Sequence, residues 1–441
     1  MSLSSGAMRL HLVRAGEKLR LWLRDAPRGK FWLFFTASIF FNTGFSIFYF
    51  LFNIYLLGLG WTERSLGLIG SVLAVGSILG TIPAGRLVER IGLRRTLTLG
   101  VSLAVIFSIL RACILWQPAQ LGLALLSGIV MCSWAVCLSP AVAALTTERQ
   151  RPFAFSLMFA SGISIAGLGG LIAGHLPGWL FKSSWHLTSG ANWGLPAHQL
   201  TAVQTNRATL VIGCVIAGLT LIPLSRIVLA TPAPQERRQR LSDPFLRRFL
   251  PAMAVWGLVT GAIPPFANVY FVHHFGMSLE RTGFVFSISQ LVQFLAILGA
   301  PLLFRRAGIA SGVMLTQFAT AASLLWLATA HSAQFAAYIY WAYMAVQCMN
   351  EPGIFSILMA NTPEHQHSRA SAATFLVSSA SQAVASLAMG AAIVRFGYPC
   401  SIAAIAGLAA LAAILFRRLA RNAAPTSSPF PGSSAATEQA V

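Results

Sequence analysis

Long apolar runs separated by short polar loops are the feature that most constrains how this chain can fold. A helix needs roughly 20 apolar residues to cross the hydrocarbon core of a bilayer. Lipid offers the backbone no hydrogen bonds, so such runs must be helical. The pattern predicts an all-α membrane protein with twelve transmembrane helices. The twelve runs are 31–57, 65–87, 96–116, 121–145, 153–176, 209–229, 249–272, 282–303, 311–330, 335–360, 371–394 and 401–416.

Composition agrees with a lipid environment. Only 10% of the 441 residues are charged and 56% are hydrophobic, whereas a soluble domain carries about 25% charged residues. The formal charge of +20 is typical of nucleic-acid binding, but the basic residues occupy short loops between apolar runs. We therefore expect the lipid bilayer as a partner, and no nucleic acid. The six cysteines are scattered without metal-ligand or redox spacing, so neither a metal site nor a cofactor is expected.

The basic residues also predict the orientation of the chain. Of the 31 lysines and arginines, 25 fall on one side of the alternating runs and 5 on the other, with Arg111 inside the third run. Positive loops stay in the cytoplasm, so both termini are expected there, in a multi-pass inner-membrane protein. The expected parts are a basic N-terminus at 1–30, a six-helix lobe at 31–230, a cytoplasmic central loop at 231–248, a second lobe at 249–416 and a cytoplasmic tail at 417–441. Residues 9–24 form either an amphipathic surface helix or an unstructured basic leader.

The second half of the chain repeats the first. Residues of the first half recur 215 or 216 positions later, close to half of the chain length. A parallel repeat of six helices predicts two lobes related by an axis along the membrane normal, with a site at the bilayer midplane. The matching pairs include Asn53 with Asn268, Tyr55 with Tyr270, Gly60 with Gly276, Gly67 with Gly283 and Gly92 with Gly308.

The loop after the second run contains glycines, an acid and basic residues at fixed spacing. Gly92 supplies a tight turn, and Glu89 with Arg90 and Arg94 can form a charged latch across helix ends; the alternative is an ordinary basic cytoplasmic loop. This loop resembles the signature of the major facilitator superfamily, although Glu89 stands where the family usually has aspartate. The second copy departs further, with Pro301 for the first glycine and Arg305 for the acid. The latch residues are Gly85, Glu89, Arg90, Gly92, Arg94 and Arg95.

The resemblance covers nearly the whole chain and implies the fold and the activity. It implies a secondary transporter, not an enzyme, that moves a small-molecule substrate across the inner membrane by alternating access between two lobes, as a monomer. The latch would hold one conformation shut. A cavity poor in charge favours export of an amphipathic compound, coupled to protons. Uptake of a nutrient or metabolite is the alternative, and a membrane sensor without transport is a third reading.

Polar residues at membrane depth are the candidates for function. Glu351 is the only carboxylate inside an apolar run and is followed by Pro352, which can bend the helix. It is either the proton-coupling group or a structural carboxylate. Arg111 is either a functional charge at membrane depth or a residue that snorkels to the outer surface, and the pattern favours snorkelling. The repeated Asn53 and Asn268 either bind substrate or pin the outer gate. The candidates for the substrate cavity are Asn42, Gln290, Gln293, Gln347 and Asn350.

The fifth run contains regularly spaced glycines, and tryptophans follow it. Glycine every three to five residues is typical of helix packing in membranes, and Gly162, Gly167, Gly170 and Gly174 have this spacing. The segment 177–206 is predicted to be an outer loop whose tryptophans lie at the membrane interface.

Overall fold

A computed structural model describes residues 29–147, 150–190, 201–227, 229, 244–363 and 367–422. Within these ranges the regular structure is helical and no strand occurs. Residues 9–24, for which the two alternatives stay open, lie outside the described residues, as do most of the central loop and most of the C-terminal tail.

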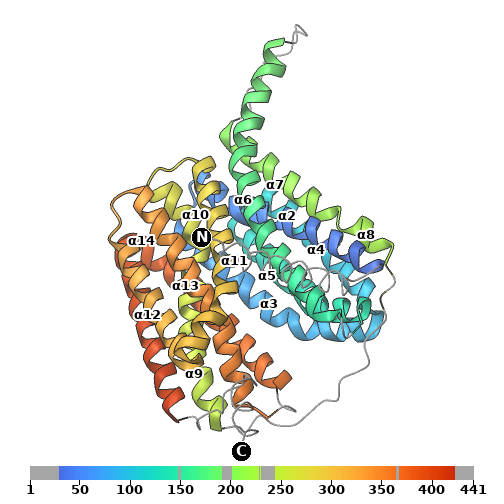
Figure 1. The fold of residues 1–441 in the computed structure, drawn as a ribbon. Helices are drawn as coiled ribbons and strands as arrows, with labels where there is room; N and C mark the ends of the chain where they lie inside the picture. Colours follow the sequence, from blue (N-terminus) through green and yellow to red (C-terminus); the bar gives the residue numbers. More distant parts are fainter. Residues whose placement is uncertain are drawn as a thin grey trace, which may run out of the picture.

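The first half packs around the helices α2 and α5. Helix α2 contacts α6 and α7, while α5 contacts α3 and α4. Helix α6 runs on through Pro177, so the predicted outer loop is wrong over 177–190, and Figure 1 shows this helix projecting beyond the bundle. The elements are α2 (Lys30–Gly58), α3 (Glu63–Ile91), α4 (Leu93–Cys113), α5 (Gln117–Leu145), α6 (Arg151–Gly190), α7 (Ala202–Gly218) and α8 (Leu221–Ser225).

The second half packs around α14 and α13. Helix α14 contacts α9 and α12, and α13 contacts α11 and α12. Helix α14 includes a non-helical break at Gly397, where φ is 75°. The elements are α9 (Pro244–Ala262), η1 (Pro264–Phe266), α10 (Ala267–Val269), η2 (Tyr270–His274), α11 (Leu279–Ala307), α12 (Ile309–Ala328), α13 (Ala333–Ala360) and α14 (His367–Asn422).

The predicted apolar runs lie in or largely within these helices. In the described part of the chain, 10 stretches are long and apolar enough to cross a membrane. The last of them, Ala370–Leu419, covers two predicted runs on either side of the break at Gly397. The prediction of an all-helical membrane protein is confirmed, while the count of twelve spans and the cytoplasmic termini stay predictions.

The internal repeat is visible in backbone geometry and in hydrogen bonds. The turns at Gly92 and Gly308 have nearly the same dihedrals, with φ of 86° and 79° and ψ of 160° and 153°. A positive φ of this size favours glycine. The Tyr55 hydroxyl donates to the Ala112 carbonyl, and the Tyr270 hydroxyl donates to the Leu327 carbonyl, both at 3.0 Å and both across 57 residues. The two halves therefore have the same turns and hydrogen bonds at equivalent positions.

The two halves meet at one end of the bundle and diverge at the other (Figure 1). Contacts between the halves run mainly through α3 with α14 and through α6 with α11. We call the end at the turns of Gly60 and Gly276 the closed end, and the end at the turns of Gly92 and Gly308 the open end. The charge distribution predicts that the open end faces the cytoplasm.

Candidate functional site

A cavity of about 520 Å³ lies between the two halves and is lined by residues of both. Its walls are mostly apolar and aromatic, as in most sites for small organic molecules. The first half contributes α2, α3, α4 and α6, and the second contributes α9, η1, α10, α11, α13 and α14. The side chains used below are Tyr49, Phe50, Phe52, Asn53, Ala74, Arg111, Asn268, Phe286, Gln290, Tyr340, Met344 and Gln382.

Arg111 is the one charged side chain among the described residues that line this cavity. It lies in the last turn of α4 and is 2% exposed. Its guanidinium carbon lies 4.3 Å from the centre of the Phe52 ring and 5.8 Å from that of Phe48. The expectation that Arg111 snorkels to the outer surface is therefore wrong. Aromatic faces on α2 attract the cation inward, and sequence alone could not show which rings it would meet.

Two asparagines connect the halves beside the cavity. The Asn53 side-chain amide donates to the Pro265 carbonyl at 2.7 Å, and that of Asn268 donates to the Phe50 carbonyl. Donor and acceptor are both related by the repeat offset of 215, so the two bonds are exchanged about a pseudo-two-fold axis. Of the two readings of this pair, the geometry favours the one in which it pins the helices of one half to those of the other.

Small residues bring the helices close together at the closed end. A Cβ atom on Gly67 would lie 3.1 Å from the Gly390 Cα, and one on Gly174 would lie 3.2 Å from the Gly283 Cα. The Ser386 hydroxyl donates to the Gly67 carbonyl at 3.3 Å. The prediction of helix packing is thus confirmed for Gly167, Gly170 and Gly174, which lie against α11, but Gly162 has no such neighbour within 4 Å.

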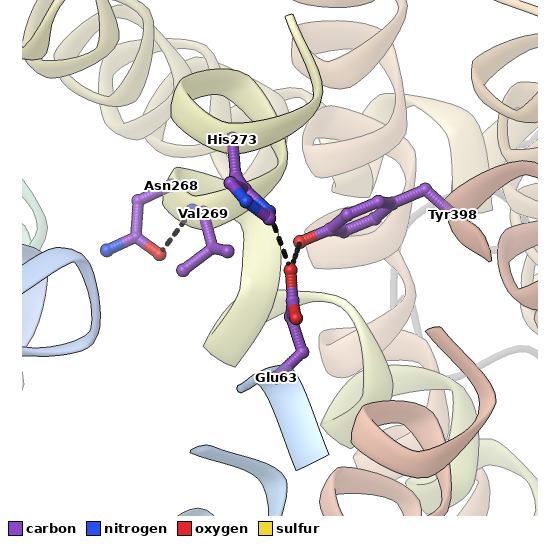
Figure 2. A network of polar contacts seen from close by, with 5 residues as sticks. All are labelled: Glu63, Asn268, Val269, His273 and Tyr398. Carbon is purple, nitrogen blue, oxygen red and sulfur yellow. Dashed lines mark hydrogen bonds and ion pairs between the residues drawn. The ribbon is translucent and has the colours of Figure 1, made fainter. Parts of the chain in front are cut away.

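A polar network joins the first residue of α3 to two elements of the second half (Figure 2). His273 Nδ1 donates to Glu63 Oε1 at 2.7 Å, and the Tyr398 hydroxyl lies 3.4 Å from the same oxygen. The Glu63 side chain is only 10% exposed, while that of His273 is 61% exposed. Thr62 caps α3, and a carboxylate in the first turn is favoured by the helix dipole. Figure 2 also shows Asn268 Oδ1 accepting from the backbone of Val269.

A second pair crosses the halves nearby. His175 Nε2 lies 3.1 Å from Glu280 Oε1, and both side chains are more than half exposed. Sequence analysis missed Glu63 and Glu280. The one available signal was the start of a helix, since each acid lies in the first turn after a capping residue, Thr62 or Ser278. Their histidine partners lie too far away in sequence to be inferred.

The predicted latch lies at the open end without a contact across the halves among the described residues. Glu89, Arg90 and Arg95 are exposed, and a Cβ atom on Gly85 would meet nothing within 4 Å. The Arg94 guanidinium donates to the Ser225 carbonyl at 2.6 Å, which ties the loop to the end of α8 in the same half. In this conformation the latch residues do not hold the halves together.

Gln290 lines the cavity, and it is the only one of the five predicted cavity residues that does so. The other four are not among its lining residues, and two of them, Asn350 and Gln293, bond to neighbouring helices. Asn350 is fully buried and accepts from the Thr316 hydroxyl at 3.2 Å. Gln293 accepts from the Cys348 thiol at 3.1 Å, and Gln347 is half-buried beside Cys348 on α13. Asn42 donates to the Ser38 carbonyl on its own helix.

Glu351 lies on α13, next to the internal Pro352. Its side chain is exposed and does not line the central cavity. No described basic side chain forms an ion pair with it. Its role as a coupling group remains a prediction.

The sequence matches a family model, and the fold matches solved structures of transporters. The family model described as Major Facilitator Superfamily matches residues 33–386. The nucleoside transporter NupG superposes with a TM-score of 0.69 at 13% identity, over 89% of this chain and 100% of that one. A bacterial homolog of the human lysosomal transporter Spinster, inward-facing and occupied, gives 0.70 at 13%, over 88% and 95%. The inward-open xylose transporter XylE from E. coli gives 0.64 at 14%, over 89% and 96%. No curated protein matches the chain.

Proposed function

The chain belongs to the Major Facilitator Superfamily, and on this premise we propose that it exports a small amphipathic solute across the inner membrane by alternating access. The family and the transporter neighbours make it a transporter and not an enzyme. The observation that carries the finer proposal is a mostly apolar cavity lined by both halves, in a bundle whose halves meet at one end and diverge at the other (Figure 1).

The two ends of the bundle differ in a way that supports alternating access. The closed end is held by short contacts that can form only when the halves approach, such as those of Gly67 with Gly390. The described latch residues of the open end make no contact of this kind. Rocking of the halves would break the contacts at the closed end and bring the latch residues of the open end together. The same cavity would then open to the other side of the membrane. A substrate shifts this equilibrium by binding the two states differently.

The walls of the cavity support a substrate with a substantial apolar part. Phe50, Phe52, Phe286 and Met344 line it, with amide side chains between them. Its volume of about 520 Å³ is within the usual range of 300–1,000 Å³ for small-molecule sites. A strongly hydrated polyanion would lose its water without gaining enough partners. This favours an amphipathic compound.

Proton coupling through Glu351 is the second part of the proposal. A transporter driven by a proton gradient needs a group that exchanges a proton with each face in turn, and intramembrane carboxylates serve as such relays. Glu351 is the only carboxylate within the apolar runs. Pro352 removes a backbone hydrogen bond beside it and permits local bending.

Transport in proteoliposomes with an imposed pH difference tests the proposal. The probes are labelled aromatic carboxylates, aromatic amines and neutral aromatic amides, with xylose and uridine to represent nutrient uptake. We expect accumulation of an amphipathic probe, driven by the pH difference. The Glu351→Gln variant should lose the response to the pH difference and keep exchange, while Glu438→Gln in the C-terminal tail should behave as wild type. Accumulation of xylose or uridine instead would favour uptake, and no movement of any probe would contradict transport.

A further inference from the structure

We propose that Arg111 binds a single anionic group of the substrate, so that the transported solute is a small amphipathic monoanion such as an aromatic or branched aliphatic carboxylate. This inference rests on the transport function proposed above and narrows its substrate class. It depends on a charge balance, on the geometry around the guanidinium and on the composition of the cavity.

The charge of Arg111 has no carboxylate partner among the described residues. Only four carboxylate side chains lie in the described ranges, and each lies outside the cavity. Glu63 pairs with His273, Glu280 pairs with His175, Glu89 is exposed at the open end and Glu351 is exposed on α13. None of them lines the cavity. Arginine stays protonated in proteins, so the cavity wall carries one positive charge that no described carboxylate compensates.

The surroundings of the guanidinium leave donors for a ligand. The rings of Phe52 and Phe48 attract the cation, but an aromatic face offers no lone pair to the planar N–H groups. The Arg111 Nε is buried and has no hydrogen-bond partner in the described part of the chain. Leaving such a donor unpaired is costly, and more so when it is charged. A carboxylate accepts two parallel hydrogen bonds from arginine, so an entering anion would satisfy this group.

The rest of the cavity determines how many charges the ligand carries. No second charged side chain lines the described walls, and the opposite half presents Phe286, Tyr340 and Met344. One cation against aromatic walls fits one anionic group on an apolar body. Gln290 and Gln382 also line the cavity, and their side-chain amides can form hydrogen bonds with one further polar group of the ligand.

The position of Arg111 also links binding to the two-lobe design. Arg111 belongs to the first half, whereas the aromatic wall of α11 and α13 belongs to the second. At the corresponding level the second half has Trp326 and Leu327, which carry no charge. A ligand whose anion contacts Arg111 and whose apolar body contacts Phe286 therefore bridges the halves.

Thermal unfolding of the purified full chain in neutral detergent tests the anion site. The probes are 4-phenylbutyrate, 1-naphthylacetate and 4-methylvalerate, each paired with its primary amide, which has nearly the same shape but no charge. A ligand that binds the folded state raises the unfolding temperature. We expect a dose-dependent rise with at least one carboxylate and a response at least about tenfold weaker with its amide, because hydrogen bonds to charged groups are roughly twice as strong as neutral ones. Equal effects of acid and amide, or no effect of any carboxylate, would overturn the proposal.

Variants assign the effect to Arg111. Arg111→Gln should abolish the preference for the acid over the amide, while Arg111→Lys should keep it in weaker form, because lysine offers a point charge without the planar fork. Arg395→Gln removes an exposed arginine outside the cavity and should leave the preference unchanged. If Arg111→Gln does not fold, the comparison of acid and amide on the wild-type protein, together with Arg111→Lys, still decides. An undiminished acid preference in Arg111→Lys or in a folded Arg111→Gln would overturn the assignment.

Two further arms separate the sources and the functions. Adding phosphatidylglycerol or phosphatidylcholine to the detergent tests a lipid headgroup, and stabilisation by phosphatidylglycerol alone would overturn a small solute as the ligand. Exchange in proteoliposomes separates binding from transport. Binding of carboxylates that depends on Arg111 but without exchange would uphold the anion site and contradict transport. Exchange of acids and amides alike in both wild type and Arg111→Gln would uphold transport and contradict the anion site.

Discussion

The closed end has contacts between the halves, whereas the described latch residues at the open end make none in this conformation. At the closed end, glycines bring helix backbones into contact, and Asn53 and Asn268 donate to carbonyls across the halves. At the open end, the charged residues of the predicted latch have long side chains, which are exposed here. Exposed ion pairs contribute little, about 0–1 kcal/mol, whereas backbone packing cannot be relieved by rotation of a side chain. Closure at the closed end should therefore be the more sensitive to substitution.

A single cysteine on the cavity wall reports which end of the protein is open. The six native cysteines are replaced, and Ala74→Cys places a single thiol on the cavity wall. A membrane-impermeant maleimide is then added from either side of the membrane. The ratio of the two labelling rates reports which end of the transporter is open.

The largest effect is expected for Gly283→Leu. A Cβ atom at Gly283 would lie 2.5 Å from the Gly170 carbonyl oxygen and 3.2 Å from the Gly174 Cα, so the closed end cannot form without moving a backbone. Overpacking costs typically 1–3 kcal/mol, which corresponds to roughly 5- to 150-fold in the equilibrium. Labelling from the closed-end side should rise accordingly. Gly299→Leu is the matched control, because its position on the same helix has no neighbour within 4 Å. Equal labelling of both variants would show that close packing does not hold this end.

The exchanged asparagines should have the next largest effect. Asn53→Ala and Asn268→Ala each remove one hydrogen bond between the halves, worth about 1 kcal/mol, or roughly fivefold in the labelling ratio. The bonds are equivalent by the repeat, so the two variants should shift the ratio by similar amounts. A Tyr55→Phe variant, which removes a bond within the first half, should leave the ratio unchanged. An effect in only one of the asparagine variants would contradict the pseudo-symmetric role.

Glu63→Gln should weaken closure by a few-fold, and Glu280→Gln by less than about twofold. The Glu63 side chain is 10% exposed and contacts both His273 and Tyr398, whereas Glu280 is 68% exposed and pairs with His175 alone. Solvent screens the more exposed pair. The same labelling ratio measures both variants. A larger effect at Glu280 would reverse the ranking that burial predicts.

Glu89→Gln should have the smallest effect and the opposite sign. Glu89 has no partner across the halves in this conformation, so its neutralisation should not destabilise the state seen here. If the latch acts only when the open end closes, the variant should shift the population by about two- to threefold toward this state, with less labelling from the closed-end side. Substrate affinity should stay within a few-fold of wild type. Unchanged labelling together with unchanged transport would remove Glu89 from the mechanism.

The internal repeat and the packing glycines could be predicted from the sequence, but the helices that they contact could not. The spacing of 215 between Asn53 and Asn268 and of 216 between Gly92 and Gly308 indicated a duplicated scaffold, because each member of a pair has an equivalent role in its half: the asparagines bond across the halves and the glycines form turns. The spacing of Gly170 and Gly174 indicated a packing face. Neither pattern named the helix on the other side of that face. Asn350 and Gln293 were placed in the substrate cavity because they are polar at membrane depth, and the structure uses them to join α13 to its neighbours.

The sequence by itself determined the membrane environment, the helical class, the duplication and the family. These properties depend on composition and on periodic or repeated patterns, which are local or nearly local along the chain. Only the tertiary structure decided that Arg111 faces the cavity and that Glu63 meets His273, 210 residues away. A buried polar group takes its partner from whichever helix packs against it. That choice is made by the angles and rotations of whole helices, to which a single side chain contributes little.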